Sequence, residues 1–426
     1  MEDFAEYNTW LEQIFYLWTN NTENKFANES TTTANIVRRL IDISALRESG
    51  VFFTSDALAE KTINNFNNPI IDSSFIVDPT CGSGSLLVAA SRKLKIFENA
   101  SQTLEQWGAQ LCGFDIYPEF VACTKMRIIL ETLIRGATPD KPLKDLTALL
   151  PNITCDDCLE KLDVIGKATH LAFNPPYNNS KEVVRYDWAS GKISNAAIYY
   201  FEIAAHLQEN CSISAILPDV LRSGSRFEAW RTITETSLAS TSLSIEGRFD
   251  SKTDIDIFLL SGVINKSMPE KIEWQKPAPL EGVPTKTVGD HFKVSVGAVV
   301  PYRDPEEGPL YSYIHPKTLP RWGKISKIPE KRRFLGTVTQ PPFVAIRRTS
   351  GPRDSQRAVP TLVLGKRPVA VENHLLVLVP KNGELYQCEN LLRLLSKEYV
   401  NEFLNNRIRC RHLTVSAVSE IPWRLE

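Results

Sequence analysis

Short apolar runs alternate with helical patterns between residues 75 and 265, and this alternation limits the possible folds most strongly. The apolar runs have the length of buried strands and cover residues 75–77, 111–116, 153–155, 170–173, 212–217, 242–249 and 255–264. Helical patterns separate several of them, at 86–97, 119–134, 196–208 and 226–234. Such β-α-β units predict an α/β fold with a largely parallel, doubly wound sheet, whose ligands bind beyond the carboxyl ends of the strands. The last two runs lack a helix between them and should pair as an antiparallel hairpin.

The flanking regions have different patterns. Apolar residues from Phe4 to Trp18 recur at three- and four-residue steps, which predicts an amphipathic helix packed on the core, and a second helix is expected at 36–45. Prolines are frequent from 267 to 329, so we place a linker near 270–290. Short strands at 343–347, 361–364, 369–371 and 375–379 and a helix at 390–405 then predict a mixed α+β domain. We expect a helical extension (1–48), a ligand-binding domain (49–270) and a C-terminal domain (285–426).

The net charge of -1 over 426 residues conceals a division. Residues 291–426 hold 22 Lys and Arg against 12 Asp and Glu, whereas the other 290 residues hold 27 against 38. The segment 311–370 alone carries 13 basic and 2 acidic side chains. An acidic front and a basic back suggest that one part handles a small molecule and the other approaches a polyanion.

Eight cysteines without a secretory leader predict a reducing, cytoplasmic compartment. The sequence contains no run of about 18 apolar residues, so it predicts no membrane span. Cys155 and Cys158 form a CxxC, but no second pair or nearby histidine completes a metal set, so two ordinary cysteines are favoured over zinc. We therefore expect neither a membrane nor a metal as a partner.

A glycine-rich turn follows the first apolar run. The segment is Asp78-Pro79-Thr80-Cys81-Gly82-Ser83-Gly84-Ser85, and a helical pattern begins after it. Glycines at this position let a ligand approach the backbone and leave the helix N-terminal amides facing that ligand. Asp78, at the strand tip, can accept a hydrogen bond from a ligand ammonium. Small residues in such turns also occur for structural reasons alone.

A second acidic residue, Asp115, ends the next apolar run. An acid at this position can bind two ribose hydroxyls, as in dinucleotide folds. It follows Gly82 by 33 residues, more than is usual, and we attribute the extra length to a polar insert at 98–110. Asp115 alone could be a surface aspartate, but together with the glycine turn it favours a nucleoside-containing cofactor.

The most specific signal is Asn174-Pro175-Pro176-Tyr177, which follows the apolar run 170–173. The Asn174 side chain supplies a carbonyl acceptor, and Pro175 fixes the backbone so that its own carbonyl can face the same cleft. Two acceptors at one site suit a planar NH2 group, because accepting both hydrogens frees the nitrogen lone pair for attack. Tyr177 offers a ring for stacking a planar substrate. A structural Pro-Pro turn is the alternative, but it does not account for this order of residues.

These three segments resemble motifs I, II and IV of the S-adenosylmethionine-dependent adenine-N6 DNA methyltransferases, in an order similar to the gamma arrangement with its C-terminal target-recognition domain. The resemblance covers residues 50–265 motif by motif and the C-terminal part by general character. It implies a seven-stranded Rossmann-like methyltransferase sheet, S-adenosyl-L-methionine as cofactor, double-stranded DNA as partner and methylation of the N6 amine of a flipped adenine. A companion restriction endonuclease would fit this family, and so would a monomeric protein. The resemblance does not identify the target sequence.

The resemblance also assigns roles to residues. Phe53-Thr54-Ser55 looks like motif X, in which Thr54 would contact the methionine end of the cofactor, although a plain N-cap is an equal alternative. The cofactor-binding set it implies is Asp78, Pro79, Cys81, Gly82, Gly84, Asp115, Ile116 and either Asp157 or Asp156, of which Asp157 fits the motif III spacing better. The target base would lie against Asn174, Pro175, Pro176, Tyr177 and Phe249. Phe249 is a loose match and could equally be a core residue.

The basic C-terminal part would bind DNA phosphates, with some arginines reading guanine. The residues proposed for this are Arg321, Lys324, Lys331, Arg332, Arg333, Arg347, Arg348, Arg353 and Arg357. The tetrapeptide also occurs in protein-glutamine and some RNA methyltransferases, and an inactive DNA-binding or specificity protein is a further alternative. The basic domain favours DNA over the first two, and the intact Asp78, Asp115 and Asn174 argue against inactivity.

Overall fold

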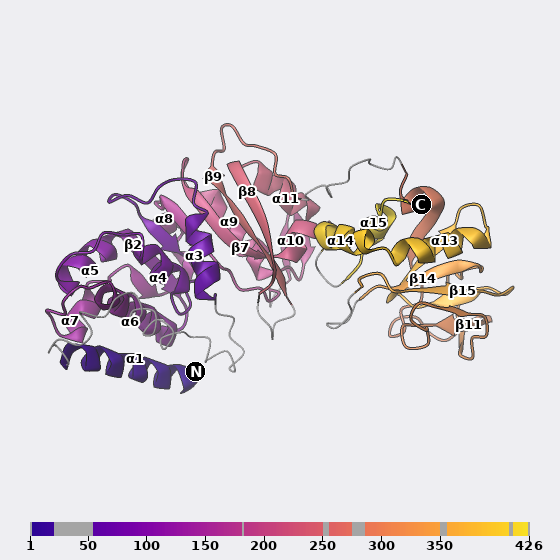
Figure 1. Ribbon diagram of the computed structural model, residues 1–426, viewed down its shortest axis with the longest axis horizontal. Coiled ribbons are helices and arrows are strands. Elements are labelled where there is room, and N and C mark those ends of the chain that lie inside the picture. Colours follow the sequence, from indigo (N-terminus) through magenta and orange to yellow (C-terminus); the bar gives the residue numbers. More distant parts are fainter. Residues whose placement is uncertain are drawn as a thin grey trace. The chain divides into compact units, whose positions relative to one another are not determined.

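The computed structural model describes residues 2–20, 54–180, 183–249, 255–274, 286–349, 356–408 and 412–424. The predicted helix at 36–45, Phe53 and Arg353 lie outside these ranges. The chain divides into two compact units (Figure 1). The first comprises Met1–Leu221, Arg226–Phe249 and Ile257–Ile272, and the second comprises Arg222–Ser225, Asp250–Asp256 and Glu273–Glu426.

A seven-stranded sheet forms the centre of the first unit, with the strand order β3-β2-β1-β4-β7-β9-β8. Its strands are β1 (Ile76–Asp78), β2 (Leu111–Asp115), β3 (Ile153–Cys155), β4 (His170–Phe173), β7 (Ser212–Pro218), β8 (Leu238–Arg248) and β9 (Asp256–Ile264). The pairs from β3 to β7 are parallel, and β9 is antiparallel to β7. The predicted doubly wound α/β class is confirmed. A separate hairpin pairs β5 (Val184–Tyr186) with β6 (Ala189–Gly191).

Helices pack around this sheet, and its strands β1, β4, β7 and β9 are largely buried. The helices are α3 (Asp56–Asn64), α4 (Ser85–Ser91), α5 (Ala100–Gln110), α6 (Pro118–Ile134), α7 (Leu143–Ala148), α8 (Leu162–Ile165), α9 (Asn195–His206), α10 (Asp219–Ser223) and α11 (Glu228–Glu235), with 3-10 turns at Cys158–Glu160 and Ser225–Phe227. The segment 98–110, expected as a polar insert, is mostly the helix α5. Its Trp107 is fully buried and donates to the Lys95 carbonyl at 2.7 Å, so this insert contributes to the core.

The N-terminal helix α1 (Glu2–Asn20) packs along α6 in the first unit (Figure 1). Tyr7, Leu11 and Phe15 are its buried residues, and they recur at the steps of four that place side chains on one helix face. Asn8 Nδ2 adds a hydrogen bond of 3.0 Å to the Glu119 carbonyl. The predicted core-packing role of this helix is confirmed.

The second unit contains two sheets, with strand orders β10-β17-β14-β15-β12 and β13-β11-β16. Their strands are β10 (Phe292–Val296), β11 (Leu310–Ile314), β12 (Gly323–Ile325), β13 (Lys331–Arg333), β14 (Phe343–Arg347), β15 (Pro360–Val363), β16 (Val369–Val371) and β17 (Leu375–Pro380). Its helices are α12 (Val288–His291), α13 (Leu385–Leu395), α14 (Glu398–Arg407) and α15 (Val415–Ser419). The helix α13 packs on β14, β15 and β17 over a core that includes Leu376, Leu378, Cys388 and Leu391.

One expectation for the second unit is wrong. The helix expected at 390–405 is divided, because α13 ends at Leu395 and Lys397, in an extended conformation, precedes the start of α14 at Glu398. Three strands that the sequence pattern did not predict, β10, β11 and β12, lie in the proline-rich region. These strands are three to five residues long, too short for an alternation to be recognised. Among the described helices, none is long and apolar enough to cross a membrane.

Candidate functional site

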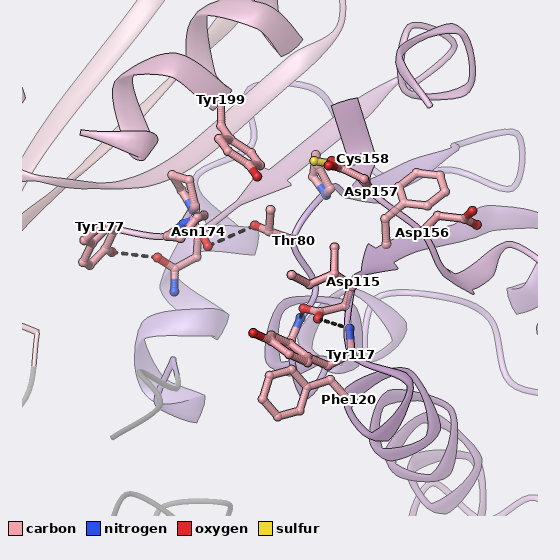
Figure 2. Close-up of a pocket in the computed structure, with 16 residues that line it drawn as sticks. Thr80, Asp115, Tyr117, Phe120, Asp156, Asp157, Cys158, Asn174, Tyr177 and Tyr199 are labelled. Atoms are coloured by element: carbon pink, nitrogen blue, oxygen red, sulfur yellow. Dashed lines mark hydrogen bonds between the residues drawn. The ribbon is translucent and has the colours of Figure 1, made fainter. Parts of the chain in front are cut away.

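A cavity of about 250 Å³ lies beyond the carboxyl ends of β1, β2 and β4 in the first unit. Figure 2 shows the side chains that surround it. They come from distant parts of the chain: Pro79, Thr80, Gly82, Phe114, Asp115, Ile116, Tyr117, Phe120, Asp156, Asp157, Cys158, Asn174, Pro175, Pro176, Tyr177 and Tyr199. The sheet topology therefore brings all three predicted segments to one site.

The glycine turn between β1 and α4 has a backbone that requires glycine. Gly82 and Gly84 have φ values of +51° and +83°. A side chain at Gly84 would lie 2.7 Å from Thr124, whereas the space beside Gly82 is open. Thr124 donates to the Gly82 carbonyl at 2.9 Å, and the buried Arg127 donates to the Ser83 carbonyl at 2.7 Å. These two side chains thus hold the main chain of the turn, and the open side of the turn at Gly82 faces the cavity.

Asp78 lies at the end of β1 and is 1% exposed. Within the described residues its carboxyl accepts a hydrogen bond from the Thr80 N–H at 3.2 Å and forms no ion pair. Burial, opposed only in part by that hydrogen bond, raises the pKa of Asp78 to about 8. Asp78 also lines a small polar cavity of about 50 Å³ together with Thr54, Ser83, Ser85 and Asn174. A cation that entered this cavity would provide the positively charged partner that the Asp78 carboxylate lacks among the described residues.

Asp115 ends β2 and connects two parts of the cavity wall. One carboxylate oxygen accepts from the Gly82 N–H and the other from the Tyr117 N–H, each at 3.0 Å (Figure 2). Burial raises its pKa, and these main-chain donors oppose that effect. A carboxylate has about four lone-pair sites, so Asp115 retains acceptor capacity for ligand hydroxyls. The neighbouring Ile116 is 60% exposed although it is aliphatic, which leaves an apolar surface at the cavity wall.

Asp156 and Asp157 both line the cavity, but their carboxylates are used differently. Asp156 pairs with Lys161 at 3.0 Å, and the hydrogen bond from the Thr154 side chain and this lysine lower its pKa. Asp157 accepts from the Leu159 N–H through one oxygen and so begins a 3-10 turn. Cys158 is buried and Cys155 is exposed. In the described part of the chain, no group of three His, Cys, Asp or Glu side chains has the arrangement of a metal site.

Asn174 is held at three points, and Figure 2 shows its bonds with Thr80 and Tyr177. Thr80 Oγ1 donates to its main-chain carbonyl at 3.1 Å. Its Nδ2 donates to Thr54 Oγ1 at 2.8 Å, and its Oδ1 accepts from the Tyr177 hydroxyl at 2.6 Å. Pro175 is buried and Pro176 is exposed at the cavity wall. Ser55 caps α3, whereas the Thr54 hydroxyl contacts Asn174.

The rings of Tyr177 and Phe249 lie edge to face, with centroids 5.8 Å apart and planes at 90°. Phe249 therefore lies beside the tetrapeptide, as the loose sequence match indicated. Because the two rings contact each other, they do not form a parallel slot for a base.

Aromatic residues that the sequence reading did not select also line the cavity. Tyr117 and Phe120 pack edge to face at 5.5 Å beside Asp115, and Tyr199 reaches the cavity from α9 (Figure 2). Tyr117 could have been suspected from its place two residues after the strand-end Asp115, and in the structure it is 46% exposed. Tyr199 has no such signal, because it lies in an apolar helix pattern.

The basic residues predicted to bind DNA are placed differently from one another in the second unit. Arg321, Lys324, Lys331 and Arg333 are exposed. Lys324 pairs with Glu389 at 2.7 Å, and Arg333 donates to the Gly308 carbonyl at 2.9 Å. Three further arginines are partly buried and donate to neighbouring oxygens: Arg347 to Leu319, Arg348 to Asn373 and Arg357 to Asn405.

Arg332 is used inside its own unit. It is 8% exposed, pairs with Glu306 at 2.8 Å and donates to the Asp304 carbonyl at 2.7 Å. Its guanidinium also lies 5.7 Å from the centre of the Tyr313 ring. These contacts hold the loop before β11 against β13, so Arg332 is not part of the DNA-binding surface that we propose below.

The strand order with its antiparallel β9, and a cavity at the carboxyl ends that contains a glycine turn, define a Rossmann-like methyltransferase fold. Residues 42–236 match the model of the N-6 DNA methylase family and contain the glycine turn, Asp115 and the tetrapeptide. This part of the chain is similar to that family.

Several solved structures are similar to this chain. They include a modification subunit assigned to a type I restriction enzyme of Vibrio vulnificus (16% identity, TM-score 0.41, 57% of this chain and 51% of that chain). A protein assigned as a class I S-adenosylmethionine-dependent methyltransferase of Listeria monocytogenes matches at 13% identity and TM-score 0.40, over 58% and 73%. The type IIL restriction-modification enzyme MmeI, in complex with DNA, matches at 10% identity and TM-score 0.48, over 92% and 67%. The chain spans about half the length of the Vibrio subunit. No curated protein matches it.

Proposed function

We propose that the protein is a site-specific DNA methyltransferase that transfers a methyl group from S-adenosyl-L-methionine to the N6 amine of adenine. The observation that carries the proposal is the position of Asn174. Its amide, fixed at both ends, lines the same cavity as the glycine turn and Asp115. An acceptor for an amine and a binding site for a nucleoside therefore share one space.

The residues present fit this cofactor. Asp78 is a buried carboxyl without a cationic partner in the described residues, and the cofactor's ammonium would supply one. The open space beside Gly82 admits a ligand against the backbone. Asp115 has acceptor capacity for two ribose hydroxyls, and the exposed apolar surface of Ile116 can cover a base. Asp157 is the better candidate to bind the amine of that base, since Asp156 is paired with Lys161.

When bound, S-adenosyl-L-methionine supplies a methyl group made electrophilic by the attached sulfonium. The chain's own residues prepare the acceptor amine. The Asn174 side-chain oxygen and the Pro175 carbonyl would accept its two hydrogens, which draws the nitrogen lone pair out of the aromatic system. Tyr177 would hold the base by stacking. Removing a polar group that acts in the transition state typically reduces turnover by roughly 10²–10³-fold.

The target adenine must leave the duplex to reach Asn174. Extruding a base costs a few kcal/mol, which stacking in the enzyme offsets. In this protein, Tyr177 lines the cavity and its ring contacts that of Phe249 edge to face. We therefore assign Phe249 a part in receiving the base as well as Tyr177.

We assign residues 49–270 to catalysis and 285–426 to target recognition, preceded by the helical extension 1–48. The exposed basic residues Arg321, Lys324, Lys331 and Arg333 of the second unit are the first candidates for phosphate contacts. Arg347, Arg348 and Arg357 would take part where DNA replaces their present carbonyl or amide partners. A companion restriction endonuclease would be a further suitable partner for a protein with this function.

The proposal is tested by supplying methyl-labelled S-adenosyl-L-methionine with duplex DNA, RNA and protein in parallel. We expect label in DNA and a loss of roughly 10²-fold or more in Asn174→Ala. Asn179→Ala is the matched control, because this exposed asparagine lies beyond the tetrapeptide. Label found only in RNA or protein would overturn the DNA assignment, and full activity of Asn174→Ala would overturn the site.

A further inference from the structure

The two ends of the Asn174 amide are held by two hydroxyl groups of different chemistry. Nδ2 lies 2.8 Å from Thr54 Oγ1, and Oδ1 lies 2.6 Å from the Tyr177 hydroxyl. Thr54 is 120 residues away in sequence and 6% exposed. An amide can turn end over end, so the partners at its two ends decide whether an oxygen or an NH2 faces the substrate.

The chemistry of the two hydroxyls favours one orientation. A phenol is a better hydrogen-bond donor than an aliphatic hydroxyl and a poorer acceptor, because its oxygen lone pair is delocalised into the ring. Tyr177 is therefore matched to the amide oxygen, and Thr54 to the amide NH2. The short contact with Oδ1 is also better than the alternative from Tyr177 to the Ile216 carbonyl, which is 3.5 Å long. The amide orientation in the structure, with Oδ1 toward Tyr177 (Figure 2), is the one in which both hydroxyls have the suitable role.

Thr54 also faces the small cavity that contains Asp78, Ser83 and Ser85. A threonine hydroxyl has one hydrogen to donate and two lone pairs. Since Thr54 accepts from Asn174, its hydrogen points elsewhere, and no acceptor for it lies among the described residues. The amino-acid end of the cofactor, with its carboxylate, is the group that the proposed function places in this cavity.

We propose that Thr54 is a positioning residue that orients Asn174 for methyl transfer and links that orientation to cofactor binding. A donor bond from Thr54 to a carboxylate would make its oxygen a stronger acceptor for Nδ2, since successive hydrogen bonds polarise one another. A filled cofactor site would thereby hold the Asn174 oxygen toward the target amine. Capping of α3 does not explain Thr54, because Ser55 fulfils that role. This inference rests on the proposed function.

Thr54→Val keeps the shape of the side chain and removes the acceptor, whereas Thr54→Ser keeps the hydroxyl. We expect Thr54→Val to slow single-turnover methyl transfer by between about 10- and 100-fold at saturating cofactor and DNA, the usual effect of an unmade hydrogen bond to a buried group. We expect Thr54→Ser to restore the rate to within about threefold of wild type. A wild-type rate in Thr54→Val would overturn the inference, and so would a loss that saturating cofactor reverses completely.

Tyr177→Phe tests the other end of the amide. It keeps the stacking ring, so the KM for DNA should stay near the wild-type value while the transfer rate falls about tenfold. An unchanged rate would contradict the orienting role of the phenol.

A measurement without cofactor tests the contact itself. Because Thr54 and Asn174 share one hydrogen bond, the melting temperature of Thr54→Val/Asn174→Ala should fall by less than the sum of the two single losses. Additive losses would contradict the contact. If the wild-type protein transfers no label to any substrate, the proposed function fails, whereas an active wild type with an equally active Thr54→Val sets aside only the role of Thr54.

Discussion

The two units of the protein use their charged residues in opposite ways. In the first, Asp78 is buried without an ion-pair partner in the described residues, and its pKa is raised to about 8. In the second, Arg332 is nearly as buried but is matched by Glu306, a carbonyl and an aromatic ring. A buried charged group whose partners are complete stabilises the fold, whereas one that lacks a partner marks a place for a ligand. The charge count of the sequence does not separate these two cases.

The largest expected effect concerns Asp78. Asp78→Asn removes the carboxylate that we propose for the cofactor's ammonium, and we expect cofactor affinity to fall by roughly 100-fold or more, the range for removing one partner of a buried charge pair. Titration calorimetry measures this directly. Binding within threefold of wild type would show that Asp78 does not contact the cofactor.

The same substitution should stabilise the ligand-free protein. The folded-state pKa of Asp78 is about 8 against 3.8 for the ordinary group, so the folded protein holds a proton that the unfolded chain releases. The stability that Asp78 contributes is therefore present below pH 3.8 and decreases as pH rises toward 8. At pH 7.5, Asp78→Asn should raise the free energy of unfolding by at least about 1 kcal/mol, or ~2–4 °C in melting temperature. A lower melting temperature would contradict the burial of an unpaired carboxyl.

Cofactor affinity should depend on pH through the same group. Binding of an ammonium needs the ionised carboxylate, so affinity should rise by up to about tenfold per pH unit between pH 5.5 and 7.5. Binding titrations across this range measure the slope, and Asp78→Asn should show little of it. An equal slope in both proteins would assign the effect to another group.

Arg332 provides the contrasting case in the second unit. Arg332→Ala leaves the Asp304 carbonyl without its donor and Glu306 without its partner, and should lower the free energy of unfolding by about 1–2 kcal/mol. The exposed neighbour Arg333 is the matched control, and Arg333→Ala should change it by less than about 0.5 kcal/mol. Chemical denaturation compares the two variants. Equal effects would remove the distinction drawn between the two arginines.

The smallest effect is expected at single exposed lysines. Lys331→Glu in the full chain should weaken DNA binding roughly three- to tenfold and reduce the salt dependence by about one counterion. Lys144→Glu is the matched control, because it makes the same charge change on an exposed residue of the first unit. Fluorescence anisotropy at several salt concentrations reports both quantities. Equal loss in the two variants would indicate only a net-charge effect.

The sequence could predict that the candidate site residues lie together, because strand ends fix their positions. Asp78, Asp115 and Asn174 each follow an apolar run, and parallel strands bring such positions to one edge of a sheet. The contact between Thr54 and Asn174 could not be predicted from the sequence, since it depends on how α3 packs against α4 and β7. Tyr199 was missed because its position in α9 looks like any buried helix position.

In the second unit, the charge pattern alone did not predict which basic residues are exposed. Arg332 and Arg333 are adjacent in the sequence, but the alternation of β13 places one inside and the other outside. The break between α13 and α14 follows from an extended Lys397, and the apolar pattern continues across it. In both cases the feature is only two or three residues long, which is too short for a recognisable pattern in the sequence.

The most direct test of the central claim is mass spectrometry of nucleosides from duplex DNA treated with the protein and S-adenosyl-L-methionine. The account predicts N6-methyldeoxyadenosine from the wild-type protein and Asn179→Ala, and a loss of roughly 10²-fold or more with Asn174→Ala. A methylated base other than adenine, or N6-methyldeoxyadenosine formed equally by Asn174→Ala, would contradict it.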